Sequence, residues 1–269
     1  GLTDLHSHLV PGVDDGARTI EDSLEGIGRL WEVGIRTLVT TPHLDASLTQ
    51  TPYRLEVHLE EMDEAFELLR AAVAKTHPDM NIGRGHEVML DVPDAVLEDQ
   101  RLRLAESPFV LLEWPHLKVP PATQAVLTRL GGTGIKIVLA HPERYRGLDA
   151  NLNLAGAWRT SGAFLQVNYG SLVGRYGDSA RGRVLRFLER GWVDLFSTDF
   201  HGRPHLSLYV EEARQAMEIL GGTDHFELLA RINPTRVLKG LDPYPVPPLV
   251  GSRGVWDKVR DLFRGRERG

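Results

Sequence analysis

Short apolar runs alternate with amphipathic helical patterns along almost the whole chain. The clearest run covers residues 135–140, and its nearly continuous apolar character is typical of a parallel strand buried on both faces. Strands are predicted over residues 2–8, 37–41, 82–89, 109–114, 135–140, 164–168 and 193–197. Helices are predicted between them, over residues 20–33, 54–75, 121–130, 152–160, 178–190 and 206–220. These seven β/α units favour a TIM-like barrel or near-barrel of parallel strands, with a doubly wound open sheet as the alternative.

Length and composition predict one main domain. The 269 residues are 42% hydrophobic, which suffices for one large core. We expect a barrel domain over residues 1–241, followed over residues 242–269 by a Pro-rich linker and a short amphipathic helix. That helix would pack on the barrel or a partner in one interpretation, and would lie on a membrane surface in the other.

Charge and cysteine content exclude several classes of function. A net charge of −6 and a pI near 6.0 give no general attraction to nucleic acid, so we expect no nucleic-acid partner. The sequence has no apolar run long enough for a transmembrane segment and no signal-peptide pattern, which predicts a cytoplasmic protein. Because cysteine is absent, the chain can use neither a cysteine nucleophile nor thiolate metal ligands.

Histidines and acidic residues stand where predicted strands end. His6 and His8 alternate on the first strand, so both imidazoles can point to one face and bind one ion. The other such residues are His43, Glu87, Glu113, His141, Asp199 and His201, and a turn after the first strand carries Asp14 and Asp15. Because the C-terminal strand ends of a barrel meet at one face, this distribution predicts a multinuclear metal site. Taken singly, His43 fits a capping or core residue equally well, and Glu87 or Glu113 fits a salt bridge.

Two arginines and an asparagine are candidate substrate-binding residues. Arg144 offers a planar, permanently charged fork that suits phosphate, with an ion pair to Glu143 or a neighbouring acid as the alternative. Arg203 lies just beyond the last histidine of the pattern. Asn168 ends its strand, where it could bind a substrate or a metal-bound water, or cap the following helix.

Together these residues resemble a known family. The matching motifs are Asp4-Leu5-His6-Ser7-His8 with Pro11-Gly12-Val13-Asp14-Asp15-Gly16, Thr41-Pro42-His43, Gly85-His86-Glu87, Leu112-Glu113, Ala140-His141-Pro142-Glu143-Arg144-Tyr145, Gln166-Val167-Asn168 and Ser197-Thr198-Asp199-Phe200-His201. In this order, over roughly residues 2–240, they resemble the bacterial PHP-superfamily tyrosine phosphatases of the capsule and exopolysaccharide type.

The resemblance implies a distorted seven-stranded parallel β/α barrel that holds three divalent ions, commonly manganese or iron, with zinc as a further candidate. It implies three ligand sets, which are His6, His8, Glu87 and Asp199 for one ion, Glu87, Glu113 and His141 for a second, and Asp15, His43 and His201 for a third. It also implies that Arg144 and Arg203 bind the phosphoryl oxygens. The compact segment from His201 to His205 departs from the family pattern, which weakens the assignment of Arg203.

The expected function is hydrolysis of phosphotyrosine by a metal-activated hydroxide, on a bacterial tyrosine autokinase of polysaccharide export. His201 or a metal-bound water would protonate the leaving group. Two alternatives stay open, a small-molecule phosphatase such as one acting on histidinol phosphate, and a metal-stabilised regulatory module without turnover. The sequence also leaves a homo-oligomer open.

Overall fold

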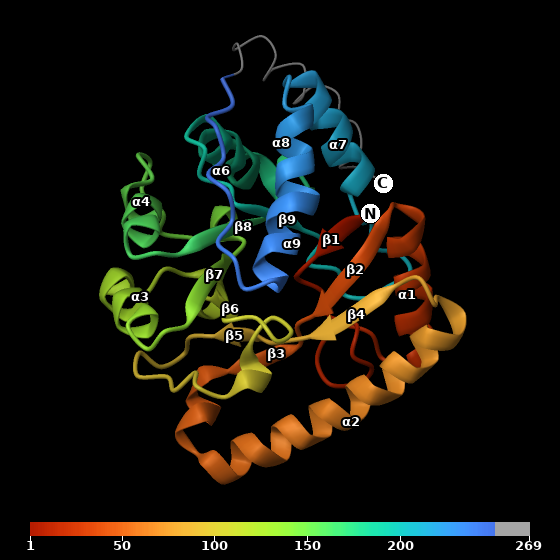
Figure 1. Cartoon of the computed structure of the whole chain (residues 1–269). Coiled ribbons are helices and arrows are strands. Elements are labelled where there is room, and N and C mark those ends of the chain that lie inside the picture. Colours follow the sequence, from red (N-terminus) through yellow and green to blue (C-terminus); the bar gives the residue numbers. More distant parts are fainter. Residues whose placement is uncertain (251–269) are drawn as a thin grey trace.

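The computed structural model describes residues 1–250, in which helices surround two parallel sheets (Figure 1). The first sheet has the order β1-β2-β4, with β1 at Leu2–Asp4, β2 at Ile35–Thr40 and β4 at Asn81–Arg84. The second has the order β3-β5-β6-β7-β8-β9, with β3 at His43–Asp45, β5 at Glu87–Met89, β6 at Phe109–Glu113, β7 at Lys136–Ala140, β8 at Phe164–Asn168 and β9 at Leu195–Ser197. Each neighbouring pair in these two orders is parallel, as predicted.

The two sheets are parts of one distorted barrel. β2 continues into β3, and β4 into β5, after breaks of only two residues each. At the other side, the segment after β1 meets the segment after β9 through a parallel bridge between Ser7 and Phe200. The His8 amide donates to the Phe200 carbonyl there, at 2.8 Å. The predicted β/α barrel is therefore confirmed, and within residues 1–250 the open doubly wound sheet is not formed.

The predicted strands over 2–8 and 82–89 differ most from the structure in extent. The prediction over 82–89 is split at Gly85, where a Cβ atom would lie 2.7 Å from the Arg103 carbonyl oxygen, so another segment crosses against the backbone at that point. The regular strand predicted over 2–8 ends at Asp4, because the backbone amides of Leu5 and Ser7 donate to the hydroxyls of Ser197 and Thr41. Beyond that interruption, only the isolated bridge at Ser7 continues the pairing.

The helices lie outside the strands (Figure 1). They are α1 at Ile20–Glu32, α2 at Pro52–Thr76, α3 at Thr123–Gly131, α4 at Asn153–Thr160, α5 at Tyr169–Leu172, α6 at Gly177–Glu189, α7 at Val210–Ile219, α8 at Thr223–Glu227 and α9 at Asn233–Leu238. Short 3-10 segments are η1 at Ala46–Gln50, η2 at Gln100–Leu102, η3 at Pro115–Leu117 and η4 at Pro142–Arg144, and η5 at Leu228–Ile232 is a π-helix. In the part of the chain that the structure describes, no helix is both long and apolar enough to cross a membrane.

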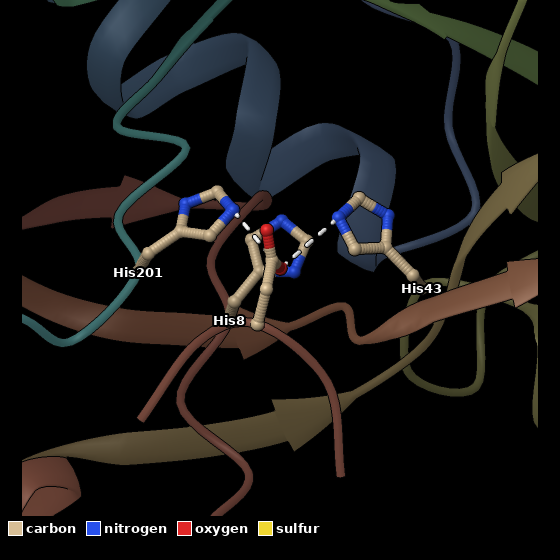
Figure 2. Close-up of side chains that lie close together, drawn as sticks. His8, His43 and His201 are labelled. Carbon is tan, nitrogen blue, oxygen red and sulfur yellow. Dashed lines mark ion pairs between the residues drawn. The ribbon is translucent and has the colours of Figure 1, made fainter. Parts of the chain in front are cut away.

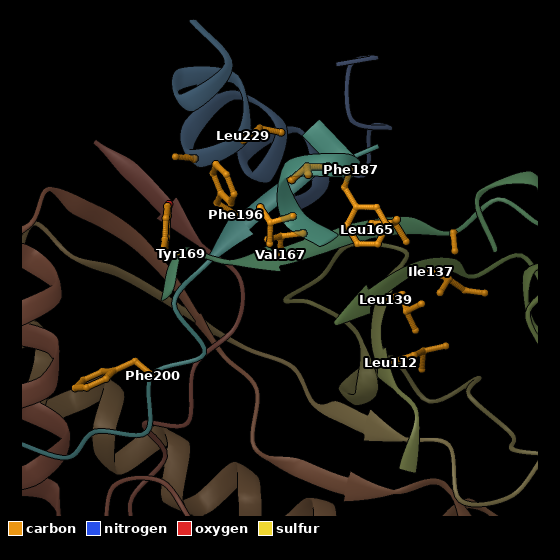
Figure 3. Close-up of a cluster of buried hydrophobic side chains, with 14 of the residues drawn as sticks. Leu112, Ile137, Leu139, Leu165, Val167, Tyr169, Phe187, Phe196, Phe200 and Leu229 are labelled. Carbon is orange, nitrogen blue, oxygen red and sulfur yellow. The ribbon is translucent and has the colours of Figure 1, made fainter. Parts of the chain in front are cut away.

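Strands β6 to β9 are buried on both faces. On β7, Ile137 and Leu139 belong to the larger core between sheet and helices, whereas Val138 and Ala140 belong to a smaller core inside the barrel. This alternation follows from the two-residue period of a strand. Figure 3 shows Ile137 and Leu139 with Leu112 and Leu165 in the larger core. The barrel is thus filled by side chains, and a site can form only at its ends.

Residues 242–250 form an extended segment that packs on the barrel. The Leu249 amide donates to the Leu188 carbonyl at 2.9 Å, and the Tyr244 amide donates to the Asn233 side chain at 2.8 Å. Val246 and Leu249 are buried. The predicted amphipathic C-terminal helix lies outside the described residues, and the division of the chain at residue 242 stays a prediction.

Candidate metal centre

The predicted site residues gather at the C-terminal end of the barrel. Glu113 ends β6, His141 follows β7, Asn168 ends β8 and Asp199 comes two residues after β9. Strand breaks bring further residues to the same place, because His43 opens β3 and Glu87 opens β5 beyond the two interruptions. The two strand breaks therefore place His43 and Glu87 at the site, where residues of unbroken strands would not lie.

Backbone conformation turns two of these side chains. His141 has φ of 35° and Asp199 has φ of 53°, both in the left-handed region that non-glycine residues seldom adopt. Such strain persists only where the surrounding structure imposes it, and it gathers at functional sites. His141 directly follows β7, and Asp199 comes two residues after β9. The strained conformation therefore changes the direction of the chain at the end of each strand.

The most buried group consists of His6, His8, Glu87 and Asp199, with one candidate ligand atom from each within 4.8 Å of the others. The Nε2 atom of His6 lies 3.1 Å from Glu87 Oε2 and 3.3 Å from Asp199 Oδ1. These four residues are the first predicted ligand set, and the structure brings all of them together.

The second group consists of His43, Glu87 and Glu113. The predicted set had His141 in place of His43. The His141 Nε2 atom lies 2.9 Å from Glu87 Oε1 but 3.8 Å from Glu113 Oε2, whereas His43 Nδ1 lies 3.2 Å from Glu87 Oε2 and 3.6 Å from Glu113 Oε1. Both imidazoles therefore border the Glu87 and Glu113 carboxylates.

The third group consists of His8, Asp15, His43 and His201. Figure 2 shows His43 and His201 on either side of one carboxylate, with His8 beside them, and the Asp15 Oδ1 atom lies 3.4 Å from Nε2 of both His43 and His201. This contains the predicted set of Asp15, His43 and His201 and adds His8, whose ring stacks on that of His201 at 4.1 Å. Asp15 is the exposed member of the group.

A second layer of residues fixes the buried imidazoles. Asp14 accepts a hydrogen bond from His8 Nδ1 at 2.8 Å, and Gln166 Oε1 lies 2.9 Å from His6 Nδ1. The Gln166 amide donates to Asn168, whose amide donates to Asp199, each at 2.8 Å. With Nδ1 engaged in this way, each imidazole turns Nε2 toward the centre, which is how metal-binding histidines are usually oriented.

Sequence reasoning missed the roles of Asp14 and Gln166. Asp14 stands in the predicted acidic turn, but nothing in the sequence separates it from Asp15. Gln166 gave a usable signal, because it is a polar residue inside an apolar strand and shares a face with Asn168 two positions later. Asn168 does not use its side chain to cap α5, so the capping alternative is wrong.

The arrangement of donor atoms suits divalent cations. The Nε2 atoms of His6 and His8 lie only 3.3 Å apart, and Glu87 Oε2 is buried without a hydrogen bond in the described residues. Facing lone pairs are unfavourable unless a proton or a cation lies near them. Imidazole nitrogens and carboxylate oxygens without thiolates suit borderline and hard divalent ions.

The electrostatics of the centre show the same need for positive charge. Burial opposes the imidazolium form of His6, yet the Glu87 and Asp199 carboxylates raise its pKa to about 9. Burial and the neighbouring Glu87 charge raise the pKa of Glu113 to about 8. Burial disfavours the Asp199 carboxylate too, but His6 and His8 hold its pKa below the usual range. Protons on His6 and Glu113 thus neutralise carboxylates that a cation would otherwise neutralise.

The two predicted phosphate-binding arginines lie in different surroundings. Arg144 donates from Nη1 to Asp199 Oδ2 at 2.7 Å, and its guanidinium lies 4.2 Å from the ring centre of Tyr176. Its ion pair is therefore with a neighbouring acid of the centre. The Glu143 carboxyl group instead accepts a hydrogen bond from the backbone N–H of Asn168. Arg203 donates to the Asp15 carbonyl at 2.7 Å, which ties it to the acidic turn.

The remaining histidines lie apart from this centre. In residues 1–250, none of the candidate ion-binding groups includes His58, His77, His86, His116, His205 or His225. His86, adjacent to Glu87, directs Nδ1 to the Arg101 carbonyl at 3.0 Å. The side chains of the adjacent residues His86 and Glu87 therefore face opposite ways, as in extended backbone.

Comparisons with known proteins agree with these features. Tyrosine-protein phosphatase YwqE of Bacillus subtilis is 28% identical over 239 residues, which cover 86% of this chain and 92% of that protein. Tyrosine-protein phosphatase CpsB of Streptococcus pneumoniae is 26% identical over 244 residues, which cover 88% and 98%. A solved structure from work on YwqE and CpsB, described as unique metal-dependent tyrosine phosphatases, superposes with a TM-score of 0.76 at 25% identity and covers 93% of this chain and all of that one.

An amidohydrolase from Mycoplasma synoviae superposes with a TM-score of 0.50 at 15% identity, over 97% of this chain and 94% of that one, and thus shares the fold alone. Residues 2–239 match the family described as "Capsular polysaccharide synthesis, CpsB/CapC". That match spans the barrel and every residue of the candidate metal centre, and so the chain belongs to the CpsB/CapC family.

Proposed function

We propose that this chain is a metal-dependent protein-tyrosine phosphatase. The observation that carries the proposal is the set of three adjoining histidine and carboxylate groups at one end of the barrel, with the Arg144 guanidinium on their edge. Membership of the CpsB/CapC family and similarity to YwqE and CpsB, both described as tyrosine-protein phosphatases, support it.

Three divalent ions would be held by the three groups. His6, His8, Glu87 and Asp199 would hold the first, and Asp15, His43 and His201 the third. Glu87 and Glu113, with His141 or His43, would hold the second. Manganese is the ion we propose, and iron is the nearest alternative, because the donor set contains only nitrogen and oxygen. Bound ions would supply Lewis acidity and water activation for transfer of a phosphoryl group to water.

The chain's own residues would orient and neutralise the substrate. Arg144 contacts the Asp199 carboxylate at the edge of the centre, so it would bind a phosphoryl oxygen and stabilise charge that develops there. His201 is held through Nδ1 on the Asp199 carbonyl at 3.0 Å, which leaves Nε2 for an ion or for proton delivery to the leaving phenolate.

Asn168 and Arg203 would act less directly than the sequence suggests. Both polar groups of the Asn168 amide are engaged, one by Gln166 and one by Asp199, so we propose that Asn168 positions the Asp199 carboxylate. Arg203 would hold the Asp15 turn through its carbonyl and would reach phosphate only by leaving that contact.

The substrate we propose is a phosphotyrosine protein of capsule synthesis, with a tyrosine autokinase of polysaccharide export as the specific candidate. The family description supports the process but names no partner. A cytoplasmic location, in keeping with a kinase substrate on that side of the membrane, stays a prediction.

The test is a comparison of substrates with one metal-loaded preparation. Protein stripped of metal and reloaded with manganese would be assayed against a phosphotyrosine peptide, histidinol phosphate and a phosphoserine peptide. We expect the phosphotyrosine peptide to give the highest kcat/KM. A preference for histidinol phosphate would favour the small-molecule phosphatase instead, and no turnover of any substrate by fully loaded protein would favour the regulatory module.

A further inference from the structure

A groove of about 850 Å³ opens beside the metal centre, on the side of Asp15 and His43. All of β3 lines one wall, together with Ser47 and Leu48 of η1. The start of α2 lines the opposite wall, and this helix runs beneath β3 in Figure 1. Because Asp15 and His43 belong both to the groove and to the third ligand group, the groove and the centre are continuous.

One wall of the groove is the edge of a sheet. β3 stands at the end of the order β3-β5-β6-β7-β8-β9, and in the described part of the chain it pairs with β5 alone. The unpaired side of an edge strand presents backbone donors and acceptors that can bind an extended peptide. The His43 amide is already bonded to Asp14, and the backbone groups of Leu44 are directed toward β5, so Asp45 is the residue of β3 whose backbone is available to a ligand.

The other wall carries exposed apolar side chains. Tyr53 and Val57 are four residues apart on α2 and therefore share a face. Their exposed fractions are 79% and 38%, high for a tyrosine and a valine that line a groove. Within residues 1–250, the Tyr53 ring stacks on no other aromatic ring and no cation. Exposed aromatic residues at a groove are typical contact points for a peptide ligand.

We propose that this groove binds the segment of the substrate protein that flanks the phosphotyrosine, in an extended conformation between β3 and the start of α2. The phosphate would enter the metal centre past Asp15 and His43, while Tyr53 and Val57 contact side chains of the flanking residues. This inference rests on the proposed phosphatase function and adds that the substrate is recognised as a peptide, beyond its phosphotyrosine ring.

The test separates recognition of the peptide from chemistry at phosphorus. Full-length, manganese-loaded protein would be assayed with p-nitrophenyl phosphate, with free phosphotyrosine and with a phosphotyrosine peptide. Tyr53→Ala and Val57→Ala would be compared with Leu68→Ala, which removes a 70% exposed apolar side chain from the same helix but outside the groove. Because Tyr53 and Leu68 are both highly exposed, their truncation leaves the core intact.

Wild-type protein should hydrolyse the peptide with a higher kcat/KM than free phosphotyrosine. Tyr53→Ala should raise KM for the peptide about tenfold with little change in kcat. The same variant should hydrolyse p-nitrophenyl phosphate within about twofold of wild type, and Leu68→Ala should stay within that range for every substrate.

Equal effects of Tyr53→Ala on the peptide and on p-nitrophenyl phosphate would overturn the groove assignment, as would wild-type rates that are no better for the peptide than for free phosphotyrosine. Failure of the proposed tyrosine-phosphatase function looks different, because wild-type protein would then hydrolyse neither the phosphotyrosine peptide nor free phosphotyrosine.

Discussion

Arg144 places a permanent positive charge against Asp199, at the edge of the metal centre. Replacement by alanine should lower kcat for phosphotyrosine hydrolysis by about 10²–10³, because a charge-assisted donor aimed at developing charge is lost. Arg144→Lys should recover only part of the rate, since the ammonium cannot reproduce the two-pronged guanidinium contact. Steady-state kinetics would be combined with metal analysis of each variant. Near-normal kcat and KM in Arg144→Ala with three ions bound would make Arg144 a structural partner of Asp199.

Glu113 gives the centre a pH dependence whose sign can be stated. Its pKa of about 8 lies above the ordinary value, so at neutral pH the metal-free protein keeps a proton on this carboxyl group. An ion that binds there must displace that proton, and another from His6, whose pKa is about 9. Apparent metal affinity should therefore increase as pH rises from about 6 to about 9.

Titration calorimetry in buffers of different ionisation enthalpy measures the protons released. Glu113→Gln, which carries no ionisable proton, should release about one fewer per protein. Affinity that is flat across this pH range, with no proton release, would contradict the assignment of Glu113 as a ligand.

The turn from Asp14 to Gly16 is the element that carries two acids to the centre, and it depends on a close backbone approach. A Cβ atom on Gly16 would lie 2.1 Å from the His8 carbonyl oxygen, so Gly16→Ala must displace the turn. We expect a loss of about 1–3 kcal/mol in the free energy of unfolding and weaker metal binding, because Asp14 and Asp15 move with the turn. Thermal melts and metal titrations would measure both effects.

Gly182 on α6 is the matched control, because a Cβ there meets no atom within 4 Å. Gly182→Ala should leave metal binding unchanged and should stabilise the helix by up to about 1 kcal/mol. If Gly16→Ala behaved like Gly182→Ala, the turn would tolerate displacement and would not set the position of its acids.

Sequence patterns predict the elements far better than their interruptions. The strand over 164–168 is confirmed at both ends, because a run of apolar residues between turns fixes its limits. The break between β4 and β5 could not be predicted, since it depends on a distant segment that crosses at Gly85. For the site, strand-end histidines and acids located the centre, whereas the closeness of His43 to Glu113 depends on the break between β2 and β3, beyond which His43 lies.

For the molecule as a whole, the candidate ion-binding groups draw their residues from segments in or next to β1, β3, β5, β6 and β9. Chelation should abolish phosphotyrosine hydrolysis and lower the melting temperature, and manganese should restore both. A ligand at about 1,000 times its Kd stabilises the folded state by about 4 kcal/mol, so the shift is large enough for calorimetry. Thiol alkylation is the control, and it should change nothing because the chain has no cysteine. Full turnover by protein verified to be free of metal would contradict the proposed mechanism.

The positions of the candidate ligands along the chain also determine when, during synthesis, a metal ion can bind. His6 and His8 leave the ribosome first, yet Asp199 and His201, with which they share ion-binding groups, are added only after most of the barrel has been made. Since neither of these groups is complete until then, a nascent chain that stops before Asp199 holds an unfinished centre. We therefore expect metal to bind late, after most of the barrel has folded. A shortage of metal in the cell would then leave full-length barrels with an empty metal centre.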